Sequence, residues 1–132
     1  MIINYDIFHS GLVSFISILN DSGFLHNEYG PAEIGYSYNK GIPIVSSEKW
    51  FISGDLHRIG GPAAIYYNFY GAGVEAERYY INGLKHNELG PAETRYQIIV
   101  GDRVMIKSHY YLNNLMLTKE EWEDQLATKL YW

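Results

Sequence analysis

The chain has 132 residues, a formal net charge of −5 and no cysteine. This length corresponds to one domain, long enough to bury about two thirds of its unfolded surface and so to form a core. The lack of cysteine excludes disulfides and thiolate metal sites. The negative charge disfavours direct binding to nucleic acid, which normally needs a basic surface.

Residues 1–6 carry neither the basic region nor the small-residue cleavage site of a secretory signal peptide. No apolar run approaches the roughly 20 residues that a helix needs to cross a membrane. We therefore expect a cytoplasmic protein without a membrane partner.

One motif, Gly-x-x-His-x-x-x-Gly-Pro-Ala, occurs three times, beginning at Gly23, Gly54 and Gly83. A fourth copy, from Tyr110, has lost the histidine and the Gly-Pro-Ala, as terminal copies in repeat proteins often do. We expect the motif residues to be structural. They are His26, Gly30, Pro31, His57, Gly61, Pro62, His86, Gly90 and Pro91.

Each copy predicts a β-hairpin. The first strand is aromatic and β-branched, as in residues 78–81, and Asn82-Gly83 predicts a tight turn because both residues tolerate positive φ. The motif proline cannot donate a hydrogen bond within a sheet, so we place it where the second strand starts. Further turns are expected at 39–41 and 101–102, and a loop at 71–73. The repeats are expected near residues 14–45, 46–75, 76–106 and 107–117.

The last segment predicts a helix over residues 118–130. Thr118 and Glu121 fit a capping box, and Trp122, Leu126 and Leu130 lie on one helical stripe. We expect this helix to cover one end or face of the sheet and to shield an open edge. The predicted fold is a single, mainly β domain over residues 1–132. Three to four stacked hairpins form an antiparallel meander in one curved sheet, with one C-terminal amphipathic helix.

The pattern Tyr-Tyr-Ile-Asn-Gly-x-x-His-x-x-x-Gly-Pro-Ala of residues 79–92 resembles the MORN-like repeats of bacteriophage and giant-virus proteins. Residues 111–121 are similar to the C-terminal closure of such chains, and the resemblance covers residues 23 to about 122. The chain departs from the pattern in its first 20 residues, at Asn27 and Asn87, where Arg is common, and at Asn114, in place of Gly. The resemblance implies stacked hairpins, a viral origin, a location in the host cytoplasm and an interaction scaffold. It implies no reaction.

The three repeat histidines suggest a metal site, but their expected spacing argues against one. Equivalent residues of successive hairpins lie two strands apart, roughly 9–10 Å, whereas zinc requires nitrogens about 2 Å from the metal. We therefore expect no metal and no cofactor. Each histidine is expected to bond a backbone group within its own turn, between the histidine and Gly-Pro.

Carboxylates also repeat, before Gly-Pro at Glu28 and Glu88 and after it at Glu33 and Glu93. A pair about 5–10 Å apart is the arrangement that hydrolyses glycosides. The second copy has no carboxylate in either slot, so the repetition indicates a structural role. There is no nucleophile elbow, phosphate loop or His-Glu-x-x-His motif. We expect no catalytic residue and no enzyme.

Neighbouring strand residues point to opposite faces, so the paired aromatics of each unit must divide between two faces. We assign one set to the core: Trp50, Ile52, Tyr79, Ile81, Tyr110 and Leu112. The other face carries an aromatic stripe of Phe51, Tyr80 and Tyr111, with Arg78 beside it. Such a stripe is typical of interface cores, and equally of cross-strand pairs that stabilise a sheet. Stacking on single-stranded nucleic acid would also need a positive groove.

The acidic run near the C-terminus is either a solvated helix face or a surface for a basic partner. We expect a non-catalytic protein–protein interaction module, an acidic phage or viral protein that inhibits a host enzyme or defence complex. Its partner would be another protein, including a basic nucleic-acid-binding host protein. The alternatives are a structural viral component that self-assembles as a homo-oligomer, and a binder of carbohydrate or another small molecule. The candidate contact residues are Phe51, Tyr80, Tyr111, Arg78, Glu120, Glu121, Glu123 and Asp124.

Overall fold

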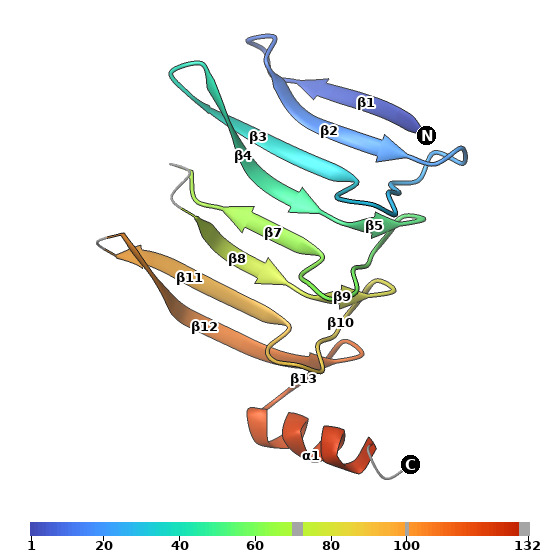
Figure 1. Ribbon diagram of the computed structural model, residues 1–132, viewed down its shortest axis with the longest axis vertical. Coiled ribbons are helices and arrows are strands. Elements are labelled where there is room, and N and C mark those ends of the chain that lie inside the picture. Colours follow the sequence, from blue (N-terminus) through green and yellow to red (C-terminus); the bar gives the residue numbers. More distant parts are fainter. Residues whose placement is uncertain (70–72, 100, 130–132) are drawn as a thin grey trace.

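The computed structural model describes residues 1–69, 73–99 and 101–129. The strands of its main sheet are β1 (Ile2–Ile7), β2 (Val13–Leu19), β3 (Glu33–Asn39), β4 (Ile42–Lys49), β7 (Ala64–Tyr67), β8 (Val74–Arg78), β11 (Glu93–Ile99), β12 (Asp102–Leu112) and β13 (Leu115–Leu117). These nine strands lie side by side in chain order (Figure 1), and neighbouring strands pair antiparallel. The mainly β fold and the antiparallel meander are as predicted.

Two short ribbons stand beside the main sheet. β5 (Phe51–Ile52) pairs with β6 (Asp55–Leu56), and β9 (Tyr80–Ile81) pairs with β10 (Leu84–Lys85). They continue β4 and β8 beyond the edge of the main ladder (Figure 1). The single sheet that the sequence predicted is therefore wrong, since each of these two units divides its hairpin between the main sheet and a ribbon.

At Trp50 and at Tyr79 the backbone passes from the hydrogen-bond ladder of the main sheet to that of the short ribbon. The N–H of Trp50 donates to the carbonyl of Ala63 at 2.7 Å, on the main-sheet side, while its own carbonyl accepts from His57 at 3.1 Å, on the ribbon side. Tyr79 repeats this pattern with the same two distances. The motif proline offers no N–H, so the Gly-Pro loop crosses from ribbon to sheet without a ladder bond at that residue.

The tight turns confirm the positive φ expected at Asn82-Gly83. Their φ values are 49° and 79°, and the equivalent Ser53-Gly54 has 46° and 87°. Asn113-Asn114 adopts the same conformation at 47° and 73°, so asparagine replaces glycine there without changing the turn. Of the loop expected at 71–73, residues 71 and 72 lie outside the described part of the chain.

The interior contains almost no large side chains. The buried apolar residues are Ala32, Ala63, Ala64, Ala76, Ala92 and Leu117. The three alanines of the Gly-Pro-Ala motifs have 0% of their surface exposed. The aromatic set assigned to the core, from Trp50 to Leu112, is only half-buried. That assignment is wrong because a single sheet layer has no second layer to pack on its face. Contacts between adjacent repeats must therefore supply much of the stability.

A β-bulge recurs at the same place in each unit. It falls between Gly35 and Tyr36, between Tyr66 and Tyr67, and between residues 95 and 96. A bulge bends its strand and strengthens the local twist. The strands therefore twist in the same way from one repeat to the next, and a tyrosine follows the bulge each time.

The helix α1 (Lys119–Lys129) lies across the last hairpin, at the C-terminal end of the stack (Figure 1). Its capping box is as predicted: the N–H of Thr118 donates to Oε1 of Glu121, and the N–H of Glu121 donates to Oγ1 of Thr118, each at 3.1 Å. Trp122 and Leu126 are half-buried, whereas Leu130 lies outside the described residues. Within the described residues, no helix has the length and apolar character needed to cross a membrane.

Candidate binding grooves between the repeats

Each repeat histidine is hydrogen bonded to the tight turn of the following repeat. The acceptors are Nδ1 of His26, His57 and His86, and the donors are the backbone N–H groups of Ser53, Asn82 and Asn113, at 2.9, 2.9 and 3.0 Å. The expected bond within the histidine's own turn is therefore wrong. In a two-residue hairpin turn the first central N–H has no partner inside the hairpin, and the preceding repeat supplies one.

Two further backbone bonds complete each junction. The second turn residue donates to the preceding repeat, with Gly54, Gly83 and Asn114 bonding the carbonyls of Leu25, Leu56 and Lys85, each at 2.8 Å. The residue after each histidine donates forward, with Asn27, Arg58 and Asn87 bonding the carbonyls of Phe51, Tyr80 and Tyr111 at 3.1 to 3.2 Å. Three equivalent hydrogen bonds thus join successive units at every junction, in addition to the strand pairing of the main sheet.

These bonds also determine the tautomer of the neutral histidine rings. A backbone N–H can only donate, so Nδ1 must be an acceptor and the ring proton of the neutral imidazole lies on Nε2. The Nε2 atoms of His26 and His86 lie 3.6 Å from carboxylate oxygens of Glu28 and Glu88. In all three histidines Nδ1 is therefore held by the fold, and in His26 and His86 a carboxylate lies near Nε2. Among the described residues, no three His, Asp or Glu side chains form a group that could hold a metal ion.

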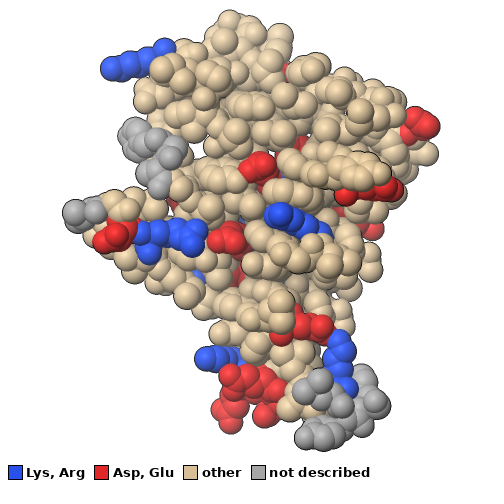
Figure 2. All heavy atoms as spheres, in the orientation of Figure 1, with Lys and Arg blue, Asp and Glu red and all other residues tan. Residues whose placement is uncertain are grey.

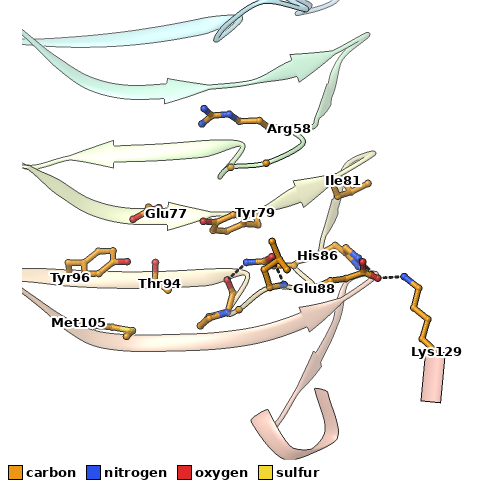
Figure 3. Close-up of a pocket in the computed structure, with 16 residues that line it drawn as sticks. Arg58, Glu77, Tyr79, Ile81, His86, Glu88, Thr94, Tyr96, Met105 and Lys129 are labelled. Carbon is orange, nitrogen blue, oxygen red and sulfur yellow. Dashed lines mark hydrogen bonds and ion pairs between the residues drawn. The ribbon is translucent and has the colours of Figure 1, made fainter. Parts of the chain in front are cut away.

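Open grooves lie between successive Gly-Pro loops. The larger one, here called the Tyr79 groove, has a volume of about 690 Å³ and lies between residues 58–61 and 86–91 (Figure 3). Tyr79 and Ile81 form its floor. Its lining extends over the main sheet to Thr94, Tyr96 and Met105.

A smaller, repeat-equivalent groove, the Trp50 groove, has a volume of about 490 Å³. It lies between residues 27–30 and 57–59, with Trp50 and Ile52 as its floor. Four of the six residues that the sequence assigned to a core thus line these grooves: Trp50, Ile52, Tyr79 and Ile81. Trp50 and Tyr79 occupy the same position in successive repeats.

One residue position makes the two grooves differ. In the Trp50 groove, the guanidinium carbon of Arg58 lies 3.9 Å from the centroid of the Trp50 ring, while its Nη1 donates to the carbonyl of Pro62 at 3.1 Å. Arg58 therefore covers the floor of the smaller groove by a cation–π contact.

In the Tyr79 groove the equivalent residue is Asn87, whose side chain is too short to reach over the floor. Its Nδ2 donates to the carbonyl of Pro91 at 2.9 Å, and its Oδ1 accepts from the N–H of Leu89 at 3.0 Å. Within the described chain, no cation or aromatic ring stacks on Tyr79. The larger groove therefore presents an uncovered phenol ring.

Burial raises the pKa of Tyr79, and the negative charge of Glu77 raises it further, while Arg58 opposes the shift. The Tyr79 hydroxyl thus stays protonated at neutral pH. At the rim, Lys129 of α1 bonds Glu88, and this hydrogen bond lowers the pKa of the Glu88 carboxyl (Figure 3). The helix therefore contributes a charged side chain to the edge of the Tyr79 groove.

The predicted aromatic stripe is not part of either groove. Phe51, Tyr80 and Tyr111 are half-buried at equivalent positions of successive units, and none of them lines the Tyr79 or the Trp50 groove. They point away from the grooves because strand neighbours alternate between faces. The ammonium group of Lys85 lies 4.9 Å from the centroid of the Tyr111 ring, so the last ring of the stripe is partly covered.

Arg78, predicted to contact a partner, is held within the sheet. Its Nε lies 3.3 Å from Oε1 of Glu93, and Lys85 donates to Oε2 of the same carboxylate at 3.2 Å. Burial alone would raise the pKa of Glu93, but the two cations outweigh it and hold the pKa below its ordinary value. Arg78 thus belongs to an ion-pair network on the face opposite the grooves.

The acidic residues Glu120, Glu123 and Asp124 are exposed on α1, and Figure 2 shows acidic side chains gathered at that end of the molecule. Glu121, also exposed, is used by the capping box, and its hydrogen bonds with Thr118 lower its pKa. The acidic run therefore divides into one capping residue and three solvated carboxylates.

Sequence reasoning missed the grooves, although the chain held a signal for them. Arg58 and Asn87 occupy the same position of the motif, directly after its histidine. Because their side chains differ so much in length, neighbouring units should leave different amounts of space beside this position. Met105 and Tyr96 could not be associated with the grooves, because they come from β12 and from a position after an unpredicted bulge.

Comparison with protein-family models, with curated proteins and with solved structures finds no match to this chain.

Proposed function

We propose that this chain is a non-catalytic module that binds another protein, and that the Tyr79 groove is its principal contact. The observation that carries this proposal is an open groove of about 690 Å³ with an aromatic floor. Hydrogen bonds between successive repeats hold the loops that frame it. A preformed concave site of this kind requires little ordering when a partner binds.

The net charge of −5 and the exposed carboxylates of α1 support a partner with a basic surface. The resemblance of residues 23–122 to MORN-like repeats supports a viral origin. We propose on these two grounds that the protein inhibits a host enzyme or defence complex.

The test is an affinity pull-down from host lysate with four versions of the chain. Beside the wild type, Asn87→Arg would cover Tyr79 as Arg58 covers Trp50. A triple Phe51→Ala/Tyr80→Ala/Tyr111→Ala variant removes the aromatic stripe. A third variant replaces Glu120, Glu123 and Asp124 by their amides.

We expect a partner that is retained by the stripe variant, weakened by the helix variant and lost by Asn87→Arg. A partner that is lost only with the stripe would move the contact to the opposite face and contradict the groove assignment. The absence of any partner would contradict protein binding as the function. Circular dichroism of each variant checks that the β fold is intact.

A second candidate, self-assembly, is supported by the uncovered edge at β1. All six residues of β1 are exposed, including Tyr5 at 61% and Ile7 at 65%. An edge strand with unpaired backbone groups and apolar side chains favours pairing with another chain. Sedimentation of the wild type beside Tyr5→Lys tests this: a dimer that the lysine abolishes would support assembly, and a concentration-independent monomer would refute it.

A further inference from the structure

The strongest indication of what the Tyr79 groove binds comes from the chain itself. The repeat spacing places an equivalent site beside the loop of residues 87–90, where Tyr110 and Leu112 hold the positions of Tyr79 and Ile81. No fourth Gly-Pro loop follows it, because α1 begins where that loop would stand. This site is called the Tyr110 groove.

Trp122 of α1 occupies the Tyr110 groove. Its ring centroid lies 4.9 Å from that of Tyr110, with the ring planes tilted by 49°. Its indole Nε1–H donates to the backbone carbonyl of Asn87 at 2.9 Å. The floor of the Tyr110 groove is therefore covered by an aromatic ring, and one wall accepts a hydrogen bond from it.

The Tyr79 groove has both of these features, and no ring or cation among the described residues stacks on its Tyr79. Its floor is the phenol of Tyr79, and the residue equivalent to Asn87 on its wall is Arg58. No hydrogen bond from a described residue reaches the Arg58 carbonyl. A backbone acceptor and an uncovered ring thus stand in the same arrangement that holds Trp122 one repeat further along.

We propose, on the basis of the function proposed above, that the Tyr79 groove takes a tryptophan side chain of the partner protein, stacked on Tyr79 and donating its indole N–H to the Arg58 carbonyl. Tryptophan is enriched among the residues that dominate protein interfaces, and its N–H usually finds an acceptor when buried. The Tyr79 groove is the larger of the two, and Asn87 leaves its Tyr79 ring bare, whereas Arg58 covers Trp50 in the smaller one.

The Trp50 groove shows the competing solution, in which an arginine covers the floor. A partner arginine could stack on Tyr79 as Arg58 stacks on Trp50. The Tyr110 groove instead holds an indole, whose N–H donates to the backbone carbonyl of the wall residue Asn87. The two occupants are separated by experiment.

The probe is a synthetic peptide of residues 117–129, which carries Trp122 in its own helical context, together with Trp122→Ala and Trp122→Arg versions. Binding to the full chain is followed by NMR of methionine methyl groups. The chain has 3 methionines, and Met105 lines the Tyr79 groove whereas Met1 does not. Ring currents from a bound indole will shift the Met105 signal.

We expect saturable shifts of the Met105 methyl with the tryptophan peptide, and affinities lower by about tenfold or more for the alanine and arginine peptides. Asn87→Arg in the chain should weaken binding similarly, because it covers Tyr79. The matched control is Asn27→Arg, the same change at the equivalent position of the first repeat and outside the Tyr79 groove, which should leave binding unchanged. The melting temperatures of both variants show whether each is folded.

Equal binding of the three peptides would overturn the proposal, as would no saturable shift of Met105 or an unchanged affinity in Asn87→Arg. Tighter binding of the arginine peptide would assign the groove to arginine instead. A protein partner lost by Asn87→Arg in the pull-down, combined with an inert tryptophan peptide, would retain the proposed function and reject only its tryptophan contact.

Discussion

Nδ1 of His57 accepts a hydrogen bond from the backbone N–H of Asn82, 25 residues further along the chain, at 2.9 Å. The histidine thereby satisfies a turn residue with positive φ in the next repeat. The repeat motif consequently joins neighbouring hairpins, because the histidine of one repeat bonds the tight turn of the next. The same arrangement recurs at the other two junctions.

Replacing His57 by alanine should lower the free energy of unfolding by about 1–3 kcal/mol, because it leaves the N–H of Asn82 without its partner. Chemical denaturation followed by circular dichroism measures the loss. The control is His9→Ala, at an exposed residue, which should change stability by less than about 0.5 kcal/mol. Equal effects of the two substitutions would show that the junction bond is not stabilising.

The alanines of the Gly-Pro-Ala motifs should tolerate no enlargement. Ala63 is 0% exposed, so Ala63→Leu must displace neighbouring backbone and should cost about 1–3 kcal/mol. Thermal melting measures the effect, with Ile59→Leu as the control because Ile59 is 81% exposed. An unchanged melting temperature for Ala63→Leu would mean that the packing at the motif is loose.

Acid should remove the contribution of the Glu93 ion pairs. The folded-state pKa of Glu93 lies below its ordinary value of 4.5, so the ionised carboxylate stabilises the fold at neutral pH. This stabilisation is lost as the pH falls below 4.5 and through the folded-state pKa. Wild type should thus be more stable than Glu93→Gln near neutral pH, and the difference should shrink in acid. Denaturation at several pH values tests this, with Glu75→Gln controlling for the loss of one carboxylate. A difference independent of pH would contradict the ion pairs.

Alkali should titrate Tyr67 only well above its ordinary pKa of 10.0. Burial and the hydrogen bond that its hydroxyl donates to Glu48 raise its pKa from 10.0 to about 12. The protonated phenol contributes stability below about pH 10, and this contribution is lost as the pH rises through about 12. Tyrosinate absorbance should show a late transition that is missing in Tyr67→Phe.

The control for that titration is Tyr29→Phe, since Tyr29 is 94% exposed. It should leave the late transition in place. If both variants lose the same part of the curve, the Tyr67–Glu48 bond does not persist in solution.

Local signals in the sequence were sufficient for several elements. The tight turn at Asn82-Gly83, the capping box of Thr118 and Glu121 and the order of the hairpins all depend on residues a few positions apart or on the spacing of the repeats. Each follows from backbone preferences that act over short distances.

Features that depend on the third dimension were not predictable. Trp50 and Tyr79 stand on the apolar face of an alternating pattern, which is typical of a strand with one buried face. They line grooves because no second layer packs on that face. The donor to each histidine lies 25 to 27 residues away, in the tight turn of another hairpin. The residue before each recurring bulge differs, being Gly, Tyr and Arg in the three repeats, and the tyrosine that follows it is common in regular strands as well.

The three-bond junction has a consequence for how such a chain can change in length. Each unit presents two acceptors and one donor to its successor, and the matching two donors and one acceptor to its predecessor. A unit copied and inserted between two others would therefore meet matching neighbours on both sides. Every insertion would add one groove, and the residue after its histidine would determine whether that groove is covered. Gene duplication followed by one substitution at that position would therefore be enough to extend the molecule and give the new segment its own binding preference.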